Sequence, residues 1–206
     1  VAHPFEHPGG QGRLQHDLTG CSPTDAIAAH LGGDLLEQVA RTAGLDPEML
    51  VERWDDTAKI TYDRTIWNEL CSLRFVDAPN DVVILGPVGV GKTFLASALG
   101  HIAVRRGRSV HFERADTLLK RLKATRLDNS HDAEVRKLLR VDVLIIDDFA
   151  LRAMDVIDTA EVYEIIVERH RRASTILTSN RDPGEMLAQM ADPLLAQSAI
   201  DRLHSN

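Results

Sequence analysis

The sequence is poor in several features that would place a protein in a familiar class. Phenylalanine, tryptophan and tyrosine make up 4% of its 206 residues, which leaves few rings on which unpaired nucleic-acid bases could stack. No apolar run approaches the roughly 18 residues of a bilayer-spanning helix. The N-terminus lacks the basic, apolar and small-residue order of a secretory signal. These absences predict a cytoplasmic protein that is not held in a membrane.

Cysteine and positive charge are also scarce. Cys21 and Cys71 lie far apart and form no C-x-x-C pair, so their spacing indicates neither a zinc site nor a redox motif. Reduced thiols in a cytoplasmic protein are the simplest interpretation. The formal net charge of −7 argues against general affinity for nucleic acid, so any DNA contact requires a local basic patch.

The chain divides into three predicted regions. Residues 1–23 are rich in glycine, proline and histidine, a composition that predicts a flexible segment. Residues 24–56 carry apolar residues at helical spacing and predict a small helical appendage, with Asp46 as a cap before Pro47 at a first helical position. Residues 57–206 form the main predicted domain.

Within the main domain, short β-branched runs alternate with helical patterns. The predicted strands are residues 82–85, 110–112, 141–146 and 175–178. The predicted helices follow residue 93, cover 116–126 and 132–140, and surround 160–170, with further helical segments near the end. This alternation predicts an α/β fold in which helices cover both faces of a parallel sheet.

A glycine-rich loop stands between the first predicted strand and its helix. Its residues, with the first residue beyond, are Gly86, Pro87, Val88, Gly89, Val90, Gly91, Lys92, Thr93 and Phe94. The order of strand, G-x-x-x-x-G-K-T and helix predicts a phosphate-binding loop, whose backbone N–H groups and helix N-terminus surround a polyphosphate. We expect Lys92 to reach the outer phosphates and the Thr93 hydroxyl to bind Mg²⁺.

Two carboxylates end the predicted strand 141–146. Asp147 and Asp148 follow its last apolar residue, at the edge of a parallel sheet where a Mg²⁺ partner of a phosphate site belongs. We expect Asp147 to orient the metal or its waters. Asp148, on the opposite side of the chain, is predicted to polarise an attacking water or accept its proton.

Two later residues extend this set. Asn180 stands just past the strand 175–178, where its amide could hydrogen-bond the attacking water or the terminal phosphate. Arg202 lies on a predicted helix near the end of the chain and could project into a neighbouring copy. An arginine finger of this kind contributes about 10³–10⁵ in rate, although a surface arginine paired with Asp201 is the simpler structural interpretation.

With these residues in order, the chain resembles the IstB-type transposition helper ATPases, in the DnaC-like branch of the AAA+ P-loop ATPases. The resemblance runs from about Trp54 to Leu203 and rests on five stretches: 83–96, 110–112, 144–149, 177–181 and 199–203. It implies that Lys92 and Thr93 belong to Walker A, Asp147 and Asp148 to Walker B, Asn180 to sensor one, and Arg202 to the arginine finger.

The resemblance also implies an activity and partners. It implies an Mg²⁺-dependent ATPase that binds DNA, assembles as an ATP-dependent homo-oligomer and assists the transposase of an insertion sequence. Two alternatives stay open, namely a helicase-loader-like adaptor that uses ATP as a switch and a truncated ATP-binding module without turnover. A small-molecule kinase has no role for Asn180 or Arg202, and the N-K-x-D guanine motif of GTPases is missing.

Three departures from the family pattern stand out. Asp148 occupies a position where many AAA+ proteins carry glutamate. The chain stops three residues after Leu203, which predicts an incomplete C-terminal lid. The first fifty residues do not match the family's usual DNA-binding N-terminal region. Tyr62, Asp63 and Arg64 are the only suggestion that the sequence offers for a base pocket.

Two basic clusters offer candidate contacts to DNA. The residues are Lys120, Arg121, Lys123, Arg126, Arg136, Lys137 and Arg140 in the first, and Arg169, His170, Arg171 and Arg172 in the second. Phosphate contacts of this kind weaken steeply with salt. With so few aromatic residues, we expect contact with the backbone of duplex DNA rather than stacking on single strands. A solvated helix face is the alternative interpretation.

Overall fold

The computed structural model describes residues 33–54 and 62–205. The predicted flexible segment 1–23, Cys21 and the first residues of the predicted appendage lie outside the described residues. In the described part of the chain, no helix combines the length and the apolar character needed to cross a membrane.

Four strands form one sheet. They are β1 (Val82–Leu85), β2 (Val110–Arg114), β3 (Val143–Asp147) and β4 (Ser174–Ser179). Their order across the sheet is β1-β4-β3-β2, and every pair is parallel. Their carboxyl ends therefore meet at one edge, and the two strands followed by the glycine loop and the paired aspartates are separated only by β4.

Helices precede, connect and follow these strands. They are α1 (Gly33–Thr42), the 3₁₀ turn η2 (Val51–Arg53), α2 (Arg64–Cys71), α3 (Arg74–Asp77), α4 (Lys92–Arg105), α5 (Ala115–Thr125), α6 (His131–Arg140), α7 (Val156–Arg169), α8 (Pro183–Ala188) and α9 (Pro193–His204). Aspartates cap several of them at the N-terminus. Asp155 and Asp182 each complete a capping box, and Asp192 precedes a proline at the first position of α9.

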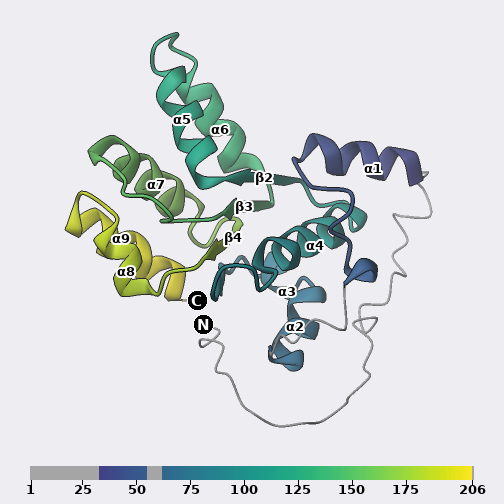
Figure 1. Cartoon of the computed structure of the whole chain (residues 1–206). Coiled ribbons are helices and arrows are strands. Elements are labelled where there is room, and N and C mark those ends of the chain that lie inside the picture. The colour runs from purple at the N-terminus through teal and green to yellow at the C-terminus, as the bar shows by residue number, and fades with distance from the viewer. Residues whose placement is uncertain (1–32, 55–61, 206) are drawn as a thin grey trace.

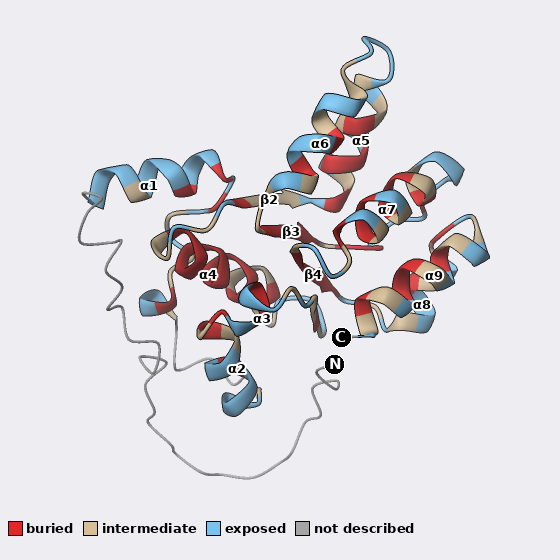
Figure 2. Cartoon of the chain, turned by 180° about the vertical axis from the view of Figure 1, so that it is seen from behind, coloured by how far each residue is buried: buried red, intermediate tan, exposed pale blue. Residues whose placement is uncertain are grey.

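Two hydrophobic cores lie on the two faces of the sheet. Side chains of a strand alternate between faces, so Val143 and Ile145 of β3 pack with α4 and the N-terminal helices, whereas Leu144 and Ile146 pack with α5 to α9. Figure 1 shows these two groups of helices on either side of the strands, and Figure 2 shows buried residues facing the sheet from both. The predicted α/β fold, a parallel sheet between helices, is confirmed.

Helix α4 is buried on most of its surface because it lies between the sheet and the N-terminal segments. At Gly100 an added Cβ would stand 2.7 Å from Leu45 Cδ2 and 2.9 Å from Ile145 Cδ1. A larger residue at this position would require the ends of the Leu45 and Ile145 side chains to shift. The position of α4 behind the glycine loop is therefore set by close packing on both sides.

Residues 33–54 share the core of the main domain. Ala40, Ala43, Leu45 and Val51 are buried in the same cluster as α4, and the Phe112 N–H donates to the Ala43 carbonyl at 2.7 Å. The boundary predicted at residue 56 stays a prediction. The described part of this region nevertheless packs directly on the domain that carries the glycine loop.

Several predicted boundaries differ from the structure. Asp46 and Pro47 form a turn and not a helix start, because the Asp46 carboxylate and carbonyl accept from the N–H groups of Glu48 and Met49. Strand β3 begins at Val143, two residues later than predicted, because the preceding Asp142 accepts from Ser109 at the end of the previous connection. Strand β2 extends to Arg114, which brings an arginine to the carboxyl edge.

Candidate nucleotide site

The glycine loop leaves its backbone N–H groups open. Gly89 and Gly91 adopt φ values of 84° and 85°, the left-handed conformation that glycine adopts without steric cost. No described protein acceptor takes a hydrogen bond from the backbone N–H groups of residues 89–93. These donors stand at the N-terminus of α4, a position that attracts anions. The loop therefore fits a phosphate group.

The Lys92 side chain folds over the glycine loop and binds its backbone. Its ammonium donates to the Pro87 carbonyl at 2.8 Å, and the residue is 7% exposed. Burial lowers the pKa of Lys92, while the nearby carboxylates of Asp148 and Asp147 act to raise it. The lysine side chain thus lies between the loop and the paired aspartates, where an anion entering the loop would meet its charge.

Thr93 and Asp147 meet across the edge of the sheet. The Thr93 hydroxyl lies 3.0 and 3.1 Å from the two carboxylate oxygens of Asp147. Asp147 is 3% exposed and accepts a second hydrogen bond from the Thr178 hydroxyl at 2.6 Å. Hydroxyl and carboxylate oxygens are the donor set that Mg²⁺ prefers. The two residues predicted to serve the metal are therefore brought together.

Asp148 is half-buried and its backbone is left-handed, with φ of 55°. Its N–H donates to the Thr178 hydroxyl at 3.0 Å. Its carboxylate pairs with Arg114 at 2.9 Å from Nη2 to Oδ2. Arg114 is aligned with Asp147 in the β2–β3 register, so the end of β2 places a cation on the acid predicted to activate water.

Asn180 lies at the edge of the sheet that carries the site, whereas Arg202 does not. Asn180 follows β4 at the same edge and is exposed, which agrees with its predicted location. The Arg202 guanidinium instead donates to the Ser198 carbonyl at 2.7 Å and to its hydroxyl, on its own helix α9. Among the described residues, no contact joins Arg202 to the glycine loop. The role in a neighbouring copy stays a prediction.

Phe94 belongs to an aromatic cluster beside the loop. Its ring lies 5.1 Å from that of Trp54, which in turn contacts Tyr62 at 6.3 Å. Asp63 caps α2 by accepting from two N–H groups. Of the residues suggested for a base pocket, Tyr62 therefore lies in the cluster that Phe94 joins, whereas the Asp63 carboxylate is used in the capping of a helix.

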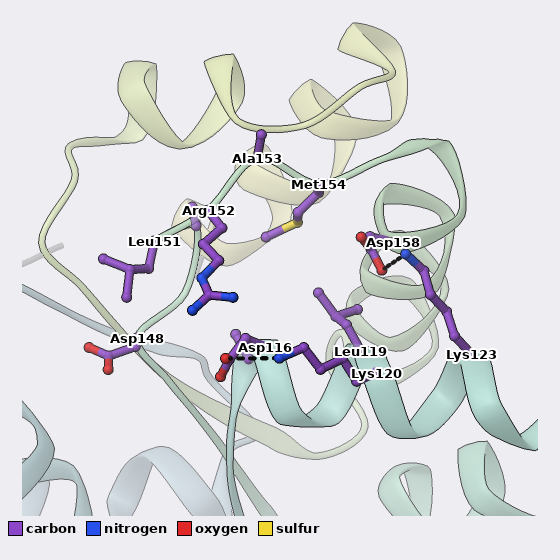
Figure 3. A pocket seen from close by; sticks show the side chains of 12 residues that line it. Asp116, Leu119, Lys120, Lys123, Asp148, Leu151, Arg152, Ala153, Met154 and Asp158 are labelled. Atoms are coloured by element: carbon purple, nitrogen blue, oxygen red, sulfur yellow. Dashed lines mark ion pairs between the residues drawn. The ribbon is translucent and has the colours of Figure 1, made fainter.

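A cavity of about 210 Å³ adjoins Asp148. It lies between α5 and the segment after β3, and Figure 3 shows the Arg152 side chain pointing toward the α5 residues Asp116 and Lys120. None of the loop residues 86–93 lines it. Asp148 therefore borders a second space besides the predicted phosphate site.

Most of the first basic cluster is neutralised within the protein. Arg121 pairs with Glu113 and Glu134, Lys123 with Asp155 and Asp158, and Arg126 with the buried Glu161. Burial acts to raise the pKa of Glu113, but hydrogen bonds from His111 and Arg121 outweigh it and lower the pKa to about 2. Arg136 and Arg140 are exposed and make no ion pair with any described residue.

In the second basic cluster, the predicted DNA contact of Arg169 is wrong. Arg169 is 1% exposed, because its guanidinium donates to the carbonyls of Leu138, Val141 and Ser174 and to the Thr175 hydroxyl. Burial lowers its pKa to about 10. Arg169 cannot contact DNA, whereas Arg171 and Arg172 are exposed.

Sequence reasoning missed two residues of the site, Arg114 and Thr178. Arg114 lies beyond the predicted end of the strand at 112. Thr178 ends the predicted strand 175–178, but only Asn180 beyond it has a predicted role. The signal for Thr178 was the run of three polar residues 178–180 after apolar Leu177.

The fold and the pairing of an open glycine loop with Thr93 and Asp147 define a P-loop ATP-binding domain of the AAA+ type. The chain belongs to the family of IstB-like ATP-binding proteins, whose sequence profile matches residues 34–206. This confirms the resemblance drawn from the five sequence stretches.

Curated relatives are named as ATP-binding proteins of insertion sequences. One from Mycobacterium tuberculosis is 35% identical over 87% of this chain and 71% of its own length. One of insertion sequence IS5376 from Geobacillus stearothermophilus is 30% identical over 82% and 67%. One of IS21 from Pseudomonas aeruginosa is 33% identical over 82% and 63%. The chain thus spans 63% to 71% of the lengths of these three relatives.

Solved structures share the fold. DnaI has a TM-score of 0.63 and 22% identity, covering 78% of this chain and 90% of DnaI. The replication initiator DnaA, bound to AMPPCP and single-stranded DNA, has a TM-score of 0.62 and 22% identity, covering 75% of this chain and 48% of that one. At this identity the likeness concerns the arrangement of strands and helices.

Proposed function

We propose that this protein hydrolyses ATP and assists an insertion-sequence transposase on DNA. The observation that carries the proposal is the contact of Thr93 with Asp147 beside unpaired loop N–H groups. The family and its named relatives support ATP binding and an insertion-sequence context.

Each residue has a role in this proposal. The loop 86–94 and the Lys92 ammonium bind the phosphates, and Thr93 and Asp147 hold Mg²⁺, directly or through water. The described residues contain no cluster of three or more metal-ligating side chains, so phosphate and water oxygens complete the metal's ligands, as is usual for Mg²⁺. When bound, the metal neutralises charge on the phosphates.

Hydrolysis requires a water placed against the terminal phosphate. We assign its activation to Asp148 and its orientation to Asn180, which end neighbouring strands at the same edge. In the described structure Arg114 pairs with the Asp148 carboxylate. We assign Arg202 to the site of a neighbouring copy in an ATP-dependent homo-oligomer, since its guanidinium donates hydrogen bonds only to its own helix among the described residues.

Duplex DNA contacts are assigned to exposed cations. Arg136 and Arg140 stand four residues apart on α6, which places them on one face. Lys120 and Lys137 are also exposed, although each lies near a carboxylate. The transposase is the proposed partner because the relatives are named as ATP-binding proteins of insertion sequences.

The test is steady-state ATP hydrolysis with and without duplex DNA, at low and moderate salt. We expect turnover that DNA stimulates and that loses this stimulation as salt rises, because phosphate contacts release counterions. Lys92→Ala, which removes the loop cation, should abolish nucleotide binding or turnover. Tight ATP binding without turnover would favour an ATP switch, and no response to DNA at low salt would contradict the DNA-associated role.

A further inference from the structure

Thr178 is the residue at which the two halves of the nucleotide site meet. It is fully buried near the end of β4, and its register partner on one side is Ile84 of β1, the strand that leads into the glycine loop. On its other side the β3–β4 ladder ends at Ile146 and Leu177. Beyond that point, the hydrogen bonds from β4 to the turn 147–150, which carries the paired aspartates, come from Thr178 and Ser179.

Both oxygens of Thr178 bind this turn. The hydroxyl donates to Asp147 Oδ1 at 2.6 Å and accepts from the Asp148 N–H at 3.0 Å. The main-chain carbonyl accepts from the Phe149 N–H at 2.8 Å. A hydroxyl has one proton to donate, and here it is directed to the carboxylate predicted to hold the metal.

The turn has a conformation that requires such support. Asp148 lies at φ of 55° and Ala150 at 57°, a region that is uncommon for residues other than glycine and that aspartate enters more readily than alanine. The Thr178 hydroxyl and carbonyl bind the first two N–H groups of the turn. The Asp147 carboxylate would otherwise have only Thr93 as a hydrogen-bond partner among the described residues.

Another buried threonine of the same strand shows what a purely structural role looks like. Thr175 is 1% exposed, and its hydroxyl accepts from the Arg169 guanidinium at 3.2 Å, at the amino end of β4. It contacts no residue assigned to the nucleotide. Thr178 differs in that its one hydroxyl binds both the Asp147 carboxylate and the Asp148 backbone N–H.

We propose that Thr178 is a positioning residue that sets the Asp147 carboxylate against Thr93 and holds the turn that carries Asp148. The inference rests on the proposed function, because it assigns Thr178 a part in Mg²⁺ and nucleotide use. Its hydroxyl couples metal binding to the placement of the acid that activates water. A change at Thr178 should therefore affect both steps while leaving the phosphate loop intact.

The experiment compares nucleotide affinity with and without Mg²⁺, by titrating a fluorescent ATP analogue into the full chain. Thr178→Val keeps the shape and the main-chain bond to Phe149 but removes both hydroxyl contacts. We expect its affinity in EDTA to equal that of the wild type, and its Mg²⁺-dependent gain in affinity to fall about 10- to 100-fold, the usual loss for a group that orients a metal ligand. ATP turnover should fall as well.

Two variants separate positioning from stability. Thr178→Ser, which keeps the hydroxyl, should restore the Mg²⁺-dependent gain. Thr175→Val, which removes a hydroxyl of equal burial on the same strand, should lower the thermal midpoint and leave the gain unchanged. If Thr178→Val does not fold, the pair Thr178→Ala and Thr178→Ser poses the same question, since these differ only in the hydroxyl.

The outcomes are distinguishable. A Thr178→Val protein that keeps the full Mg²⁺-dependent gain and turnover would overturn this inference alone, and would leave Thr178 with a role in folding. A wild-type protein that binds no nucleotide would overturn the proposed function and this inference with it. Loss of the gain in Thr178→Val with recovery in Thr178→Ser supports the inference.

Discussion

The two edges of the sheet use buried polar groups in opposite ways. At the amino edge, Arg169 donates to three carbonyls and a hydroxyl, Asp142 binds Ser109, and Asp81 accepts from the Thr175 N–H. At the carboxyl edge, a buried contact of Thr93, Asp147 and Thr178 stands next to loop N–H groups that no described acceptor uses.

The two edges differ in whether their hydrogen-bonding groups already have protein partners, and not in how deeply these groups are buried. Arg169, Asp142 and Asp81 bind hydroxyl and backbone groups of the protein, so they have little capacity left for a ligand. The carboxyl edge keeps donors and an acid at the solvent, where Asp148 is half-buried and Asn180 exposed. We infer that the amino edge serves stability and that the carboxyl edge serves chemistry, and the following experiments test this division.

The largest effect on stability is expected from Arg169→Met. The substitution leaves three carbonyls without this donor, of which those of Leu138 and Ser174 are buried. Each buried group left unsatisfied costs about 1–3 kcal/mol. We expect the free energy of unfolding to fall by about 3 kcal/mol or more, measured by urea denaturation. Arg172→Met is the matched control, because its exposed pair with Glu168 contributes about 0.5 kcal/mol. Equal urea midpoints for the two variants would contradict the structural role.

Arg202→Ala is expected to act on turnover alone. If Arg202 serves a neighbouring copy, turnover of the assembled protein should fall about 10³-fold or more, while ATP binding and the urea midpoint stay unchanged. Ser198→Ala, which removes the hydroxyl that Arg202 contacts, is the control. Mixing Arg202→Ala with an Asp148 variant should restore part of the turnover, and mixtures without any recovery would argue against action between copies.

Asp148→Asn should separate binding from hydrolysis. The amide cannot accept the proton of an attacking water, so we expect ATP affinity to persist and turnover to fall about 10²-fold or more, as for other general bases. Asp142→Asn offers a comparison at the amino edge, where turnover per folded molecule should not change. Unchanged hydrolysis in the Asp148 variant would remove this acid from the role of water activator.

Arg114→Ala is expected to have the smallest effect and the opposite sign. The Arg114–Asp148 pair is partly exposed, and such pairs contribute about 0.2–1 kcal/mol. Release of the carboxylate should therefore raise basal turnover by about two- to fivefold. Arg152→Ala, at the cavity beside Asp148, should leave basal turnover unchanged. A fall in turnover on loss of Arg114 would mean that the arginine assists Asp148 instead of restraining it.

The site residues that could be predicted from the sequence are those that directly follow a recognisable strand. The glycine loop, Thr93 and the paired aspartates follow directly from strands whose apolar character is local, and the structure places these residues together. The parallel α/β sheet follows from the same alternation. Walker and sensor assignments stay predictions, because the described geometry shows contacts and not turnover.

The other site residues could not be predicted, because their contacts depend on which strands lie side by side in the sheet. Thr178 and Arg114 meet the aspartates because β4 and β2 flank β3, and nothing within either segment encodes that order. The charge run 169–172 predicts a DNA contact for Arg169, because nothing in the run shows that three carbonyls will surround its guanidinium. The basic run of α5 and α6 likewise gives no sign of Glu113 and Glu161, which come from other elements.

The left-handed backbone at residue 148 also bears on which acid can stand there. Aspartate, with its short polar side chain, is among the few residues other than glycine that enter this region readily. Glutamate would extend the carboxylate by one methylene, yet would lack that ease in a conformation that costs about 1–3 kcal/mol for residues other than glycine. The length of the acidic side chain and the backbone conformation are therefore linked at residue 148. An engineer who wished to lengthen the acid would first have to reshape the turn that presents it.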